Sequence, residues 1–140
     1  MKTRATGRTH GSTALTKTGY GLSGLLSAGI IFIGARFLVR PHAAAAGYGV
    51  TNDQGGSISD PYLAVKGVRD IAFGVVTLVL LAAERPQILA RYLVATSIVP
   101  IGDAIIVLRG KGPKATAYGV HATTAAGMLA TAALLVSGPE

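Results

Sequence analysis

The feature that most constrains this chain is the length of its apolar segments. No charged residue occurs between Thr18 and Ala35, and Pro41 stops a helix that begins near Gly19. Such a helix, ending at about Arg40, covers the ~30 Å hydrocarbon core of a bilayer at ~1.5 Å per residue. Half of the residues are hydrophobic, only 14% are charged, and cysteine is absent. The sequence therefore predicts an integral membrane protein and excludes disulfides, iron–sulfur clusters and cysteine-bearing zinc sites.

Proline marks the other helices. Asp60-Pro61 has the form of an N-cap followed by proline at the first helical position, Pro86 and Pro113 follow breaks, and Pro100 predicts a kink. We expect four helices, at about 19–40, 61–83, 86–108 and 114–137. The predicted fold is an all-α, up-and-down four-helix membrane bundle. One long loop, 42–59, joins helices 1 and 2, and a basic tail, 1–18, precedes a transmembrane domain at 19–138.

The net charge of +7 indicates membrane lipids, not nucleic acid, as partners, because most cations flank the apolar segments. Cations are divided almost evenly between the two sides of the bundle. We expect cytoplasmic termini, since the first helix usually dominates orientation. The fourth helix carries small residues at four-residue steps, which permits close helix contact within the bundle or in a homodimer. They are Gly119, Thr123, Gly127 and Thr131.

Four ionisable residues interrupt the predicted spans, one on each helix. They are Arg36, Asp70, Asp103 and His121, and Arg69 adjoins Asp70. At the centre of a span such a group costs about 2.5 to 3.5 kcal/mol, so each needs a partner or water. Counted from the helix ends nearest the long loop, the four lie ~6 to ~14 Å deep, in one leaflet. We expect them to surround one pocket capped by 42–59.

Simpler interpretations exist for most of these residues. Arg36 and Arg40 can extend to the headgroups, and Lys66 and Asp70, at i and i+4, can form an ordinary intrahelical ion pair. His121 can be a neutral hydrogen-bonding strut.

Asp103 is the hardest to explain as packing, because no basic residue lies within one turn of it. Two carboxylates in one low-dielectric pocket can divide the roles of acid and base. We expect Asp70 and Asp103 to be that pair, with Arg69 or Arg36 keeping one of them ionised and His121 relaying or orienting a proton. We therefore predict acid/base catalysis on a lipophilic small molecule: epoxide opening or hydrolysis, cyclisation or isomerisation. No metal or other cofactor is expected, because metal-binding and nucleotide-binding motifs are missing. The alternative is a non-enzymatic accessory or assembly subunit, whose buried charges only specify helix packing. A cavity reaching both aspartates favours the enzyme.

Several short motifs together resemble an uncharacterised family of small four-helix microbial membrane proteins, known as a domain of unknown function and distantly similar to DoxX-like proteins. The resemblance covers roughly residues 19–136. It implies four spans but no established activity, although some members accompany secondary-metabolite pathways. Arg40, Tyr48 and Phe73 lie within these motifs and are expected to contact the substrate. The motifs are Arg40-Pro41, Ala46-Gly47-Tyr48-Gly49, Gly67-Val68-Arg69-Asp70, Phe73-Gly74, Gly102-Asp103 and His121.

Overall fold

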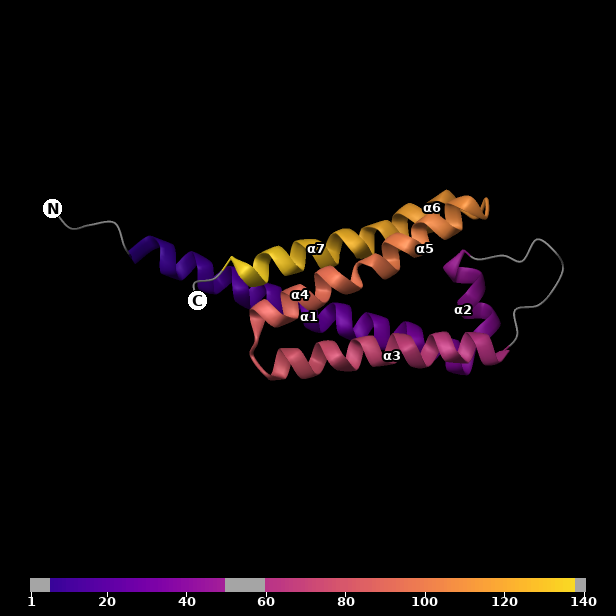
Figure 1. The fold of residues 1–140 in the computed structure, drawn as a ribbon, viewed down its shortest axis with the longest axis horizontal. Helices are drawn as coiled ribbons and strands as arrows, with labels where there is room; N and C mark the ends of the chain where they lie inside the picture. The colour runs from indigo at the N-terminus through magenta and orange to yellow at the C-terminus, as the bar shows by residue number, and fades with distance from the viewer. Residues whose placement is uncertain (1–5, 50–59, 138–140) are drawn as a thin grey trace.

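The computed structural model describes residues 6–49 and 60–137, and all regular structure within these ranges is helical (Figure 1). The prediction of an all-α protein is confirmed. In chain order the elements are α1 (Thr6–Val39), α2 (Pro41–Tyr48), α3 (Asp60–Ala82), α4 (Pro86–Thr96), α5 (Ile98–Arg109), α6 (Lys114–Thr116), the π-helical segment η1 (Ala117–Ala122) and α7 (Thr123–Val136). The last three follow one another without a break.

Three helical stretches of the described chain are long and apolar enough to cross a membrane. They are Ala14–Val39, Pro86–Arg109 and Lys114–Val136. Large apolar side chains on their outer faces, such as Leu25, Phe32 and Ile98, are exposed. An apolar surface of this extent is unusual for a soluble monomer and fits a lipid environment. These stretches indicate a membrane protein.

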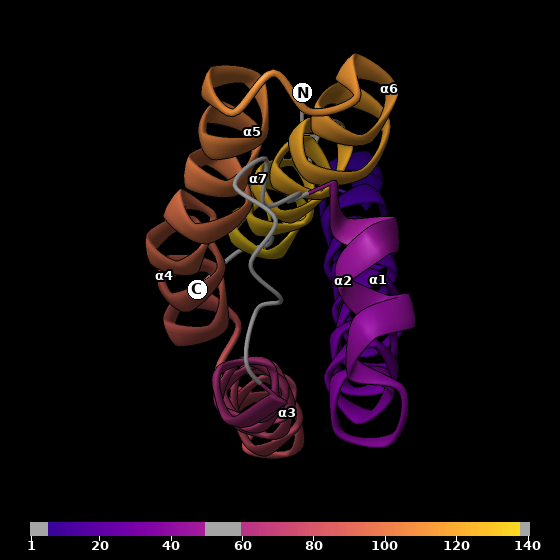
Figure 2. The ribbon, with the colours of Figure 1, turned by 90° about the vertical axis from the view of Figure 1, so that its right-hand side faces the viewer.

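The long helices form two pairs that diverge towards one end of the molecule (Figures 1 and 2). Helix α1 packs against α3, while α4 and α5 pack against α7 and η1. Contacts between α1 and α7 hold the pairs together near the end where α7 terminates. At the opposite end, α2 lies between the diverging pairs (Figure 1).

Two separate clusters of buried apolar side chains form the core. One joins α4 to α7 through Leu89, Leu93 and Leu135, and the other joins α1, α2 and α3 through Phe37, Ala44 and Leu63. No single core runs the length of the molecule in its described part. The region between the clusters is therefore the place where a cavity can form.

Glycine allows α1 and α3 to approach closely. A Cβ atom on Gly34 would lie 2.6 Å from the Gly67 carbonyl oxygen, and one on Gly74 would lie 2.4 Å from a side-chain carbon of Ile31. The Ser27 hydroxyl donates a 2.7 Å hydrogen bond to the Gly74 carbonyl across the same interface. Small residues thus position α3 against α1, as is common between helices in membranes.

The predicted start of the first helix, near Gly19, was too late. Helix α1 begins at Thr6, inside the segment expected to be a basic tail. No proline occurs before Pro41, so nothing in that segment stops the helix. Residues 1–5 lie outside the described part, and the division into a tail at 1–18 and a domain at 19–138 stays a prediction.

The expectation of a loop across 42–59 was wrong for its first part, which forms α2. Pro41 occupies a first-turn position and the following alanines are the best helix formers, so a helix begins at once. Gly49 ends it with φ of +82°, a left-handed conformation that favours glycine. The rest of the expected loop, 50–59, lies outside the described residues.

The third predicted helix is interrupted at Ser97, between α4 and α5. Pro100 has no N–H to donate to the Thr96 carbonyl four residues earlier, which weakens the helix in the turn before it. The interruption thus lies three residues before the proline, and the kink itself stays a prediction.

The last helical rod contains a π-helical segment, η1, that was not expected. Along its row of small residues, Gly119 and Thr123 are exposed whereas Thr131 is buried. The small residues are therefore exposed at the η1 end of the row and buried at its α7 end. One end packs internally, and a homodimer through the other end stays a prediction.

We predict that Gly34→Ala destabilises the protein, because its new Cβ meets the Gly67 backbone. The expected loss is about 1 to 3 kcal/mol in the free energy of unfolding. Gly29→Ala is the control, since a Cβ there has nothing within 4 Å, and it should be neutral or stabilising by up to about 1 kcal/mol. Thermal unfolding in detergent measures both. Equal stabilities would contradict close α1–α3 packing through Gly34.

Candidate functional site

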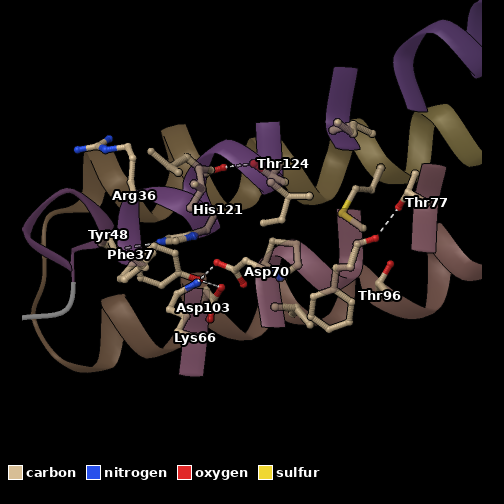
Figure 3. A pocket seen from close by; sticks show the side chains of 18 of the residues that line it. Arg36, Phe37, Tyr48, Lys66, Asp70, Thr77, Thr96, Asp103, His121 and Thr124 are labelled. Carbon is tan, nitrogen blue, oxygen red and sulfur yellow. Dashed lines mark hydrogen bonds and ion pairs between the residues drawn. The ribbon is translucent and has the colours of Figure 1, made fainter. Parts of the chain in front are cut away.

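A cavity of about 320 Å³ lies between the two core clusters (Figure 3). This volume falls at the lower end of the range for small-molecule sites. Its polar end, near α2, is formed by Tyr48, Lys66, Asp70, Asp103 and His121, and its body is mainly apolar. Four different helical segments supply these five side chains. The apolar residues lining the body are Leu26, Ile30, Ile33, Phe73, Leu93, Val99, Pro100 and Met128.

The structure brings together most of the residues that the sequence singled out. All four predicted to share a depth line the cavity, and so do two of the three expected to contact substrate. The six are Arg36, Asp70, Asp103, His121, Tyr48 and Phe73.

The arginines do not occupy the expected positions. Arg69 and Arg40 are exposed and are not among the residues lining the cavity. Arg36 borders the cavity, but its guanidinium points away from Asp70 and Asp103 (Figure 3). Sequence reasoning placed an arginine beside one carboxylate, and in the structure the cation there is Lys66.

Tyr48 is the central residue of the polar end. Its hydroxyl donates a hydrogen bond to the Asp103 carboxylate, which joins α2 to α5. Burial raises the pKa of the Tyr48 phenol above its usual value, and the hydrogen bond to Asp103 raises it further. The negative charges of Asp103 and Asp70 act in the same direction, against the opposing effect of Arg69. Tyr48 is therefore a stable hydrogen-bond donor at neutral pH.

Lys66 and Asp70 form an ion pair along one face of α3. The Lys66 ammonium lies 2.6 Å from a carboxylate oxygen of Asp70, whose side chain is only 3% exposed. The same ammonium lies 4.1 Å from the ring centroid of Tyr48 and 4.7 Å from that of Phe37. Both distances are within the range of cation–π attraction. Lys66 thus pairs with Asp70 at the cavity wall and contacts two rings from other helices.

His121 fixes the other side of Tyr48. Its Nε2 lies 3.0 Å from the Tyr48 carbonyl oxygen, and the two rings meet edge to face with centroids 4.4 Å apart. A carbonyl oxygen can only accept, so Nε2 carries the hydrogen. His121 lies in η1, and single π-helical turns within α-helices occur often at functional sites.

The end of α2 is held in place by close backbone contacts. A Cβ on Gly112 would lie 2.5 Å from the Gly49 carbonyl oxygen, and one on Gly49 would lie 2.9 Å from the Thr116 methyl group. Glycine at both positions lets α2 reach the turn between α5 and α6. This contact places the Tyr48 ring between Lys66 and His121.

Two further features bear on the chemistry of the described residues. Every buried side-chain nitrogen and oxygen atom there has a hydrogen-bond partner. No group of three His, Asp or Glu side chains among them could hold a metal ion. The site is therefore a set of paired acids, bases and hydroxyls.

Sequence reasoning missed part of the site. Lys66 was treated only as an ion-pair partner, although its i, i+4 spacing from Asp70 places it on the same face. The hydroxyl residues Thr77, Tyr92 and Thr96 were not considered, yet all three line the cavity. Seven residues separate Asp70 from Thr77 and Thr96 from Asp103, which is the signal that could have found them.

We predict that the contribution of Tyr48 to stability disappears at high pH. The folded protein disfavours the phenolate, so stability is fully present below about pH 10, the usual tyrosine pKa, and falls as pH rises further. Tyr48→Phe should lose about 1.5 to 3 kcal/mol at neutral pH, because Asp103 loses a donor. The stability gap between wild type and variant should narrow above pH 10 in thermal unfolding. A gap independent of pH would contradict this interpretation.

A comparison with known families agrees with the resemblance seen in the motifs. A family model described as a domain of unknown function, DUF4267, matches residues 27–135. This range contains every residue that lines the cavity except Leu26. No curated protein and no solved structure matches the chain. The prediction of an uncharacterised family is confirmed, and the chain belongs to the DUF4267 family of domains of unknown function.

Proposed function

We propose that the protein binds a lipophilic small molecule in the cavity and catalyses a proton-transfer reaction on it. Epoxide opening or hydrolysis, cyclisation and isomerisation all belong to this class, and none requires a metal. The observation that carries the proposal is a largely apolar cavity ending at two carboxylates, Asp70 and Asp103. A cluster kept only for helix packing has no need of such a space beside it.

The paired groups at the polar end suit a division into acid and base. In epoxide hydrolysis, the Lys66 ammonium, held at the cavity wall by its ion pair with Asp70, donates a proton to the ring oxygen. Asp103 takes a proton from the water that attacks the ring carbon. Transfer of that proton from Asp103 to Lys66 restores both groups. His121 positions Tyr48, whose hydroxyl orients the Asp103 carboxylate.

The proposed environment is a bilayer crossed by four helices, with α3 as the fourth. This helix has 23 residues, enough for ~35 Å, and runs alongside α1. Its charges Lys66 and Asp70 neutralise each other at the cavity. Up-and-down order then places both termini on one side, which we assign to the cytoplasm.

One observation favours the second candidate, a non-enzymatic accessory or assembly subunit. Both carboxylates already have partners, Lys66 for Asp70 and Tyr48 for Asp103. Paired buried charges can serve to specify helix packing alone. The two candidates predict different results when an ionisable group is removed. An enzyme should lose activity, whereas an accessory subunit should lose only stability.

We predict that Asp103→Asn abolishes most activity and leaves the fold intact. The amide keeps the shape and much of the hydrogen bonding but cannot take a proton, so the rate should fall by about 10²- to 10⁴-fold. The readout is the profile of lipophilic metabolites extracted from cells with and without the protein. Glu84→Gln is the matched control, because it makes the same chemical change at an exposed turn between α3 and α4.

The result that would overturn catalysis is equally specific. If Asp103→Asn and Asp70→Asn both left the metabolite profile of producing cells unchanged while lowering the melting temperature in detergent, the accessory-subunit function would replace the enzyme.

We also predict that single cysteines report four spans. The chain has no cysteine, so Ala43→Cys, Arg85→Cys and Lys114→Cys each give one exposed thiol at a different connection. A membrane-impermeant maleimide should label positions 43 and 114 from the same side and position 85 from the other. Labelling of positions 43 and 85 from one side would show that α3 does not cross the membrane.

A further inference from the structure

The far end of the cavity carries a second polar group that the proposed chemistry does not use. It consists of the hydroxyls of Thr77, Tyr92 and Thr96, which all line the cavity. Figure 3 shows Thr77 and Thr96 at the end away from Asp103. We call these three residues the hydroxyl subsite. They come from α3 and α4, whereas the charged end depends on α2, α3, α5 and η1.

The hydrogens of the hydroxyl subsite are already used within the protein. Thr77 donates to the Phe73 carbonyl at 2.9 Å, and Tyr92 donates to the same carbonyl at 3.1 Å. Thr96 donates to the Tyr92 carbonyl at 2.7 Å. A hydroxyl has one hydrogen and two acceptor lone pairs, so lone pairs are what these oxygens offer to a ligand. The subsite therefore accepts hydrogen bonds and requires a donor.

The spacing between the two polar ends is set by both walls of the cavity. Thr77 follows Asp70 by seven residues on α3, and Thr96 precedes Asp103 by seven residues along α4 and α5. Two helical turns correspond to ~10 Å on each wall. The rest of the lining is mainly apolar and includes Phe73, with Thr124, whose hydroxyl donates to the Val120 carbonyl, as a further hydroxyl residue. The cavity is thus a lipophilic channel with a polar group at each end.

The donor that fits is a hydroxyl and not an ammonium. The hydroxyl subsite contains no carboxylate, and an ammonium ion in an apolar cavity without a counter-ion would bear a large desolvation cost. A hydroxyl group loses only one or two hydrogen bonds to water and regains one from an acceptor here.

We propose that the substrate is bifunctional: a neutral lipophilic molecule with its reacting oxygen at Asp103 and a hydroxyl group about 10 Å away, bound by Thr77, Tyr92 and Thr96. This inference rests on the proposed function for the reacting end. The hydroxyl subsite fixes the orientation of the molecule, because an apolar chain alone could enter either end first.

Two probes test the proposal by binding alone. One is an alkyl epoxide with a terminal hydroxyl about 10 Å from the ring, and the other is the same alkyl epoxide without the hydroxyl. Calorimetric titration of the detergent-solubilised full chain should show about 5- to 10-fold tighter binding of the hydroxylated probe. Thr96→Val, which keeps the shape but removes one acceptor, should reduce that preference by weakening the binding of the hydroxylated probe.

Matched variants make the result interpretable. Thr18→Val removes a hydroxyl that bonds the carbonyl four residues earlier, as Thr96 does, but on an exposed face, so it should keep the wild-type preference. Thr77→Val is the second test of the subsite and should also reduce the preference.

The remaining outcomes decide between the hydroxyl subsite and the proposed function, or against both. Equal affinity of wild type for both probes, or a preference that survives in Thr96→Val and Thr77→Val, would overturn the hydroxyl subsite and leave the proposed function standing. Binding as predicted without turnover would support the subsite and contradict epoxide opening as the reaction. Binding of neither probe would contradict both.

Discussion

The hydrogen bond from Tyr48 to Asp103 is the interaction on which the polar end of the cavity depends. A carboxylate in a membrane span is costly unless it is paired, and α5 itself provides no basic neighbour within one turn. The partner comes instead from α2, a short helix outside the spans. Because Tyr48 also contacts Lys66 and His121, this residue joins the two helix pairs where they diverge. Without it, α2 would lose its polar attachment to α5.

The cavity follows from how each pair packs. Glycines at 34, 67 and 74 bring α1 and α3 into backbone contact, and a leucine cluster holds α4 to α7, so each pair is close-packed by itself. The pairs meet at one end only and are bridged by α2 at the other. The space left between them is mainly apolar, because most of the side chains that line it are hydrophobic. Its polarity is confined to the few positions where an ionisable or hydroxyl side chain points inwards.

The sequence predicted how deep each ionisable residue lies along its helix better than it predicted which way the side chain points. A helix rises ~1.5 Å per residue, so counting from the helix ends was enough to bring Asp70, Asp103 and His121 to one level. Which side of the helix a residue faces was harder to predict, because neighbours differ by ~100°. Asp70 therefore faces the cavity while Arg69 beside it is exposed, and Lys66, one turn away, becomes the ion-pair partner. Helix α2 was missed because the run after Pro41 has the small residues of a connection, although alanine also favours helix.

Every buried polar side-chain atom at this site already has a hydrogen-bond partner, so a polar ligand can bind only by replacing or sharing one of these hydrogen bonds. To reach Asp103, a ligand must either displace the Tyr48 hydroxyl or share it. A hydrocarbon can offer nothing in return, so its entry at this end would leave a donor and a charged acceptor without partners, at about 1 to 3 kcal/mol each. An oxygen-bearing ligand group can accept a hydrogen bond from the Tyr48 hydroxyl. An alcohol or a water molecule can also donate one to the Asp103 carboxylate. The hydrogen bond between Tyr48 and Asp103 thus both stabilises the protein and disfavours the entry of lipid hydrocarbon chains, the most abundant apolar groups around a membrane protein.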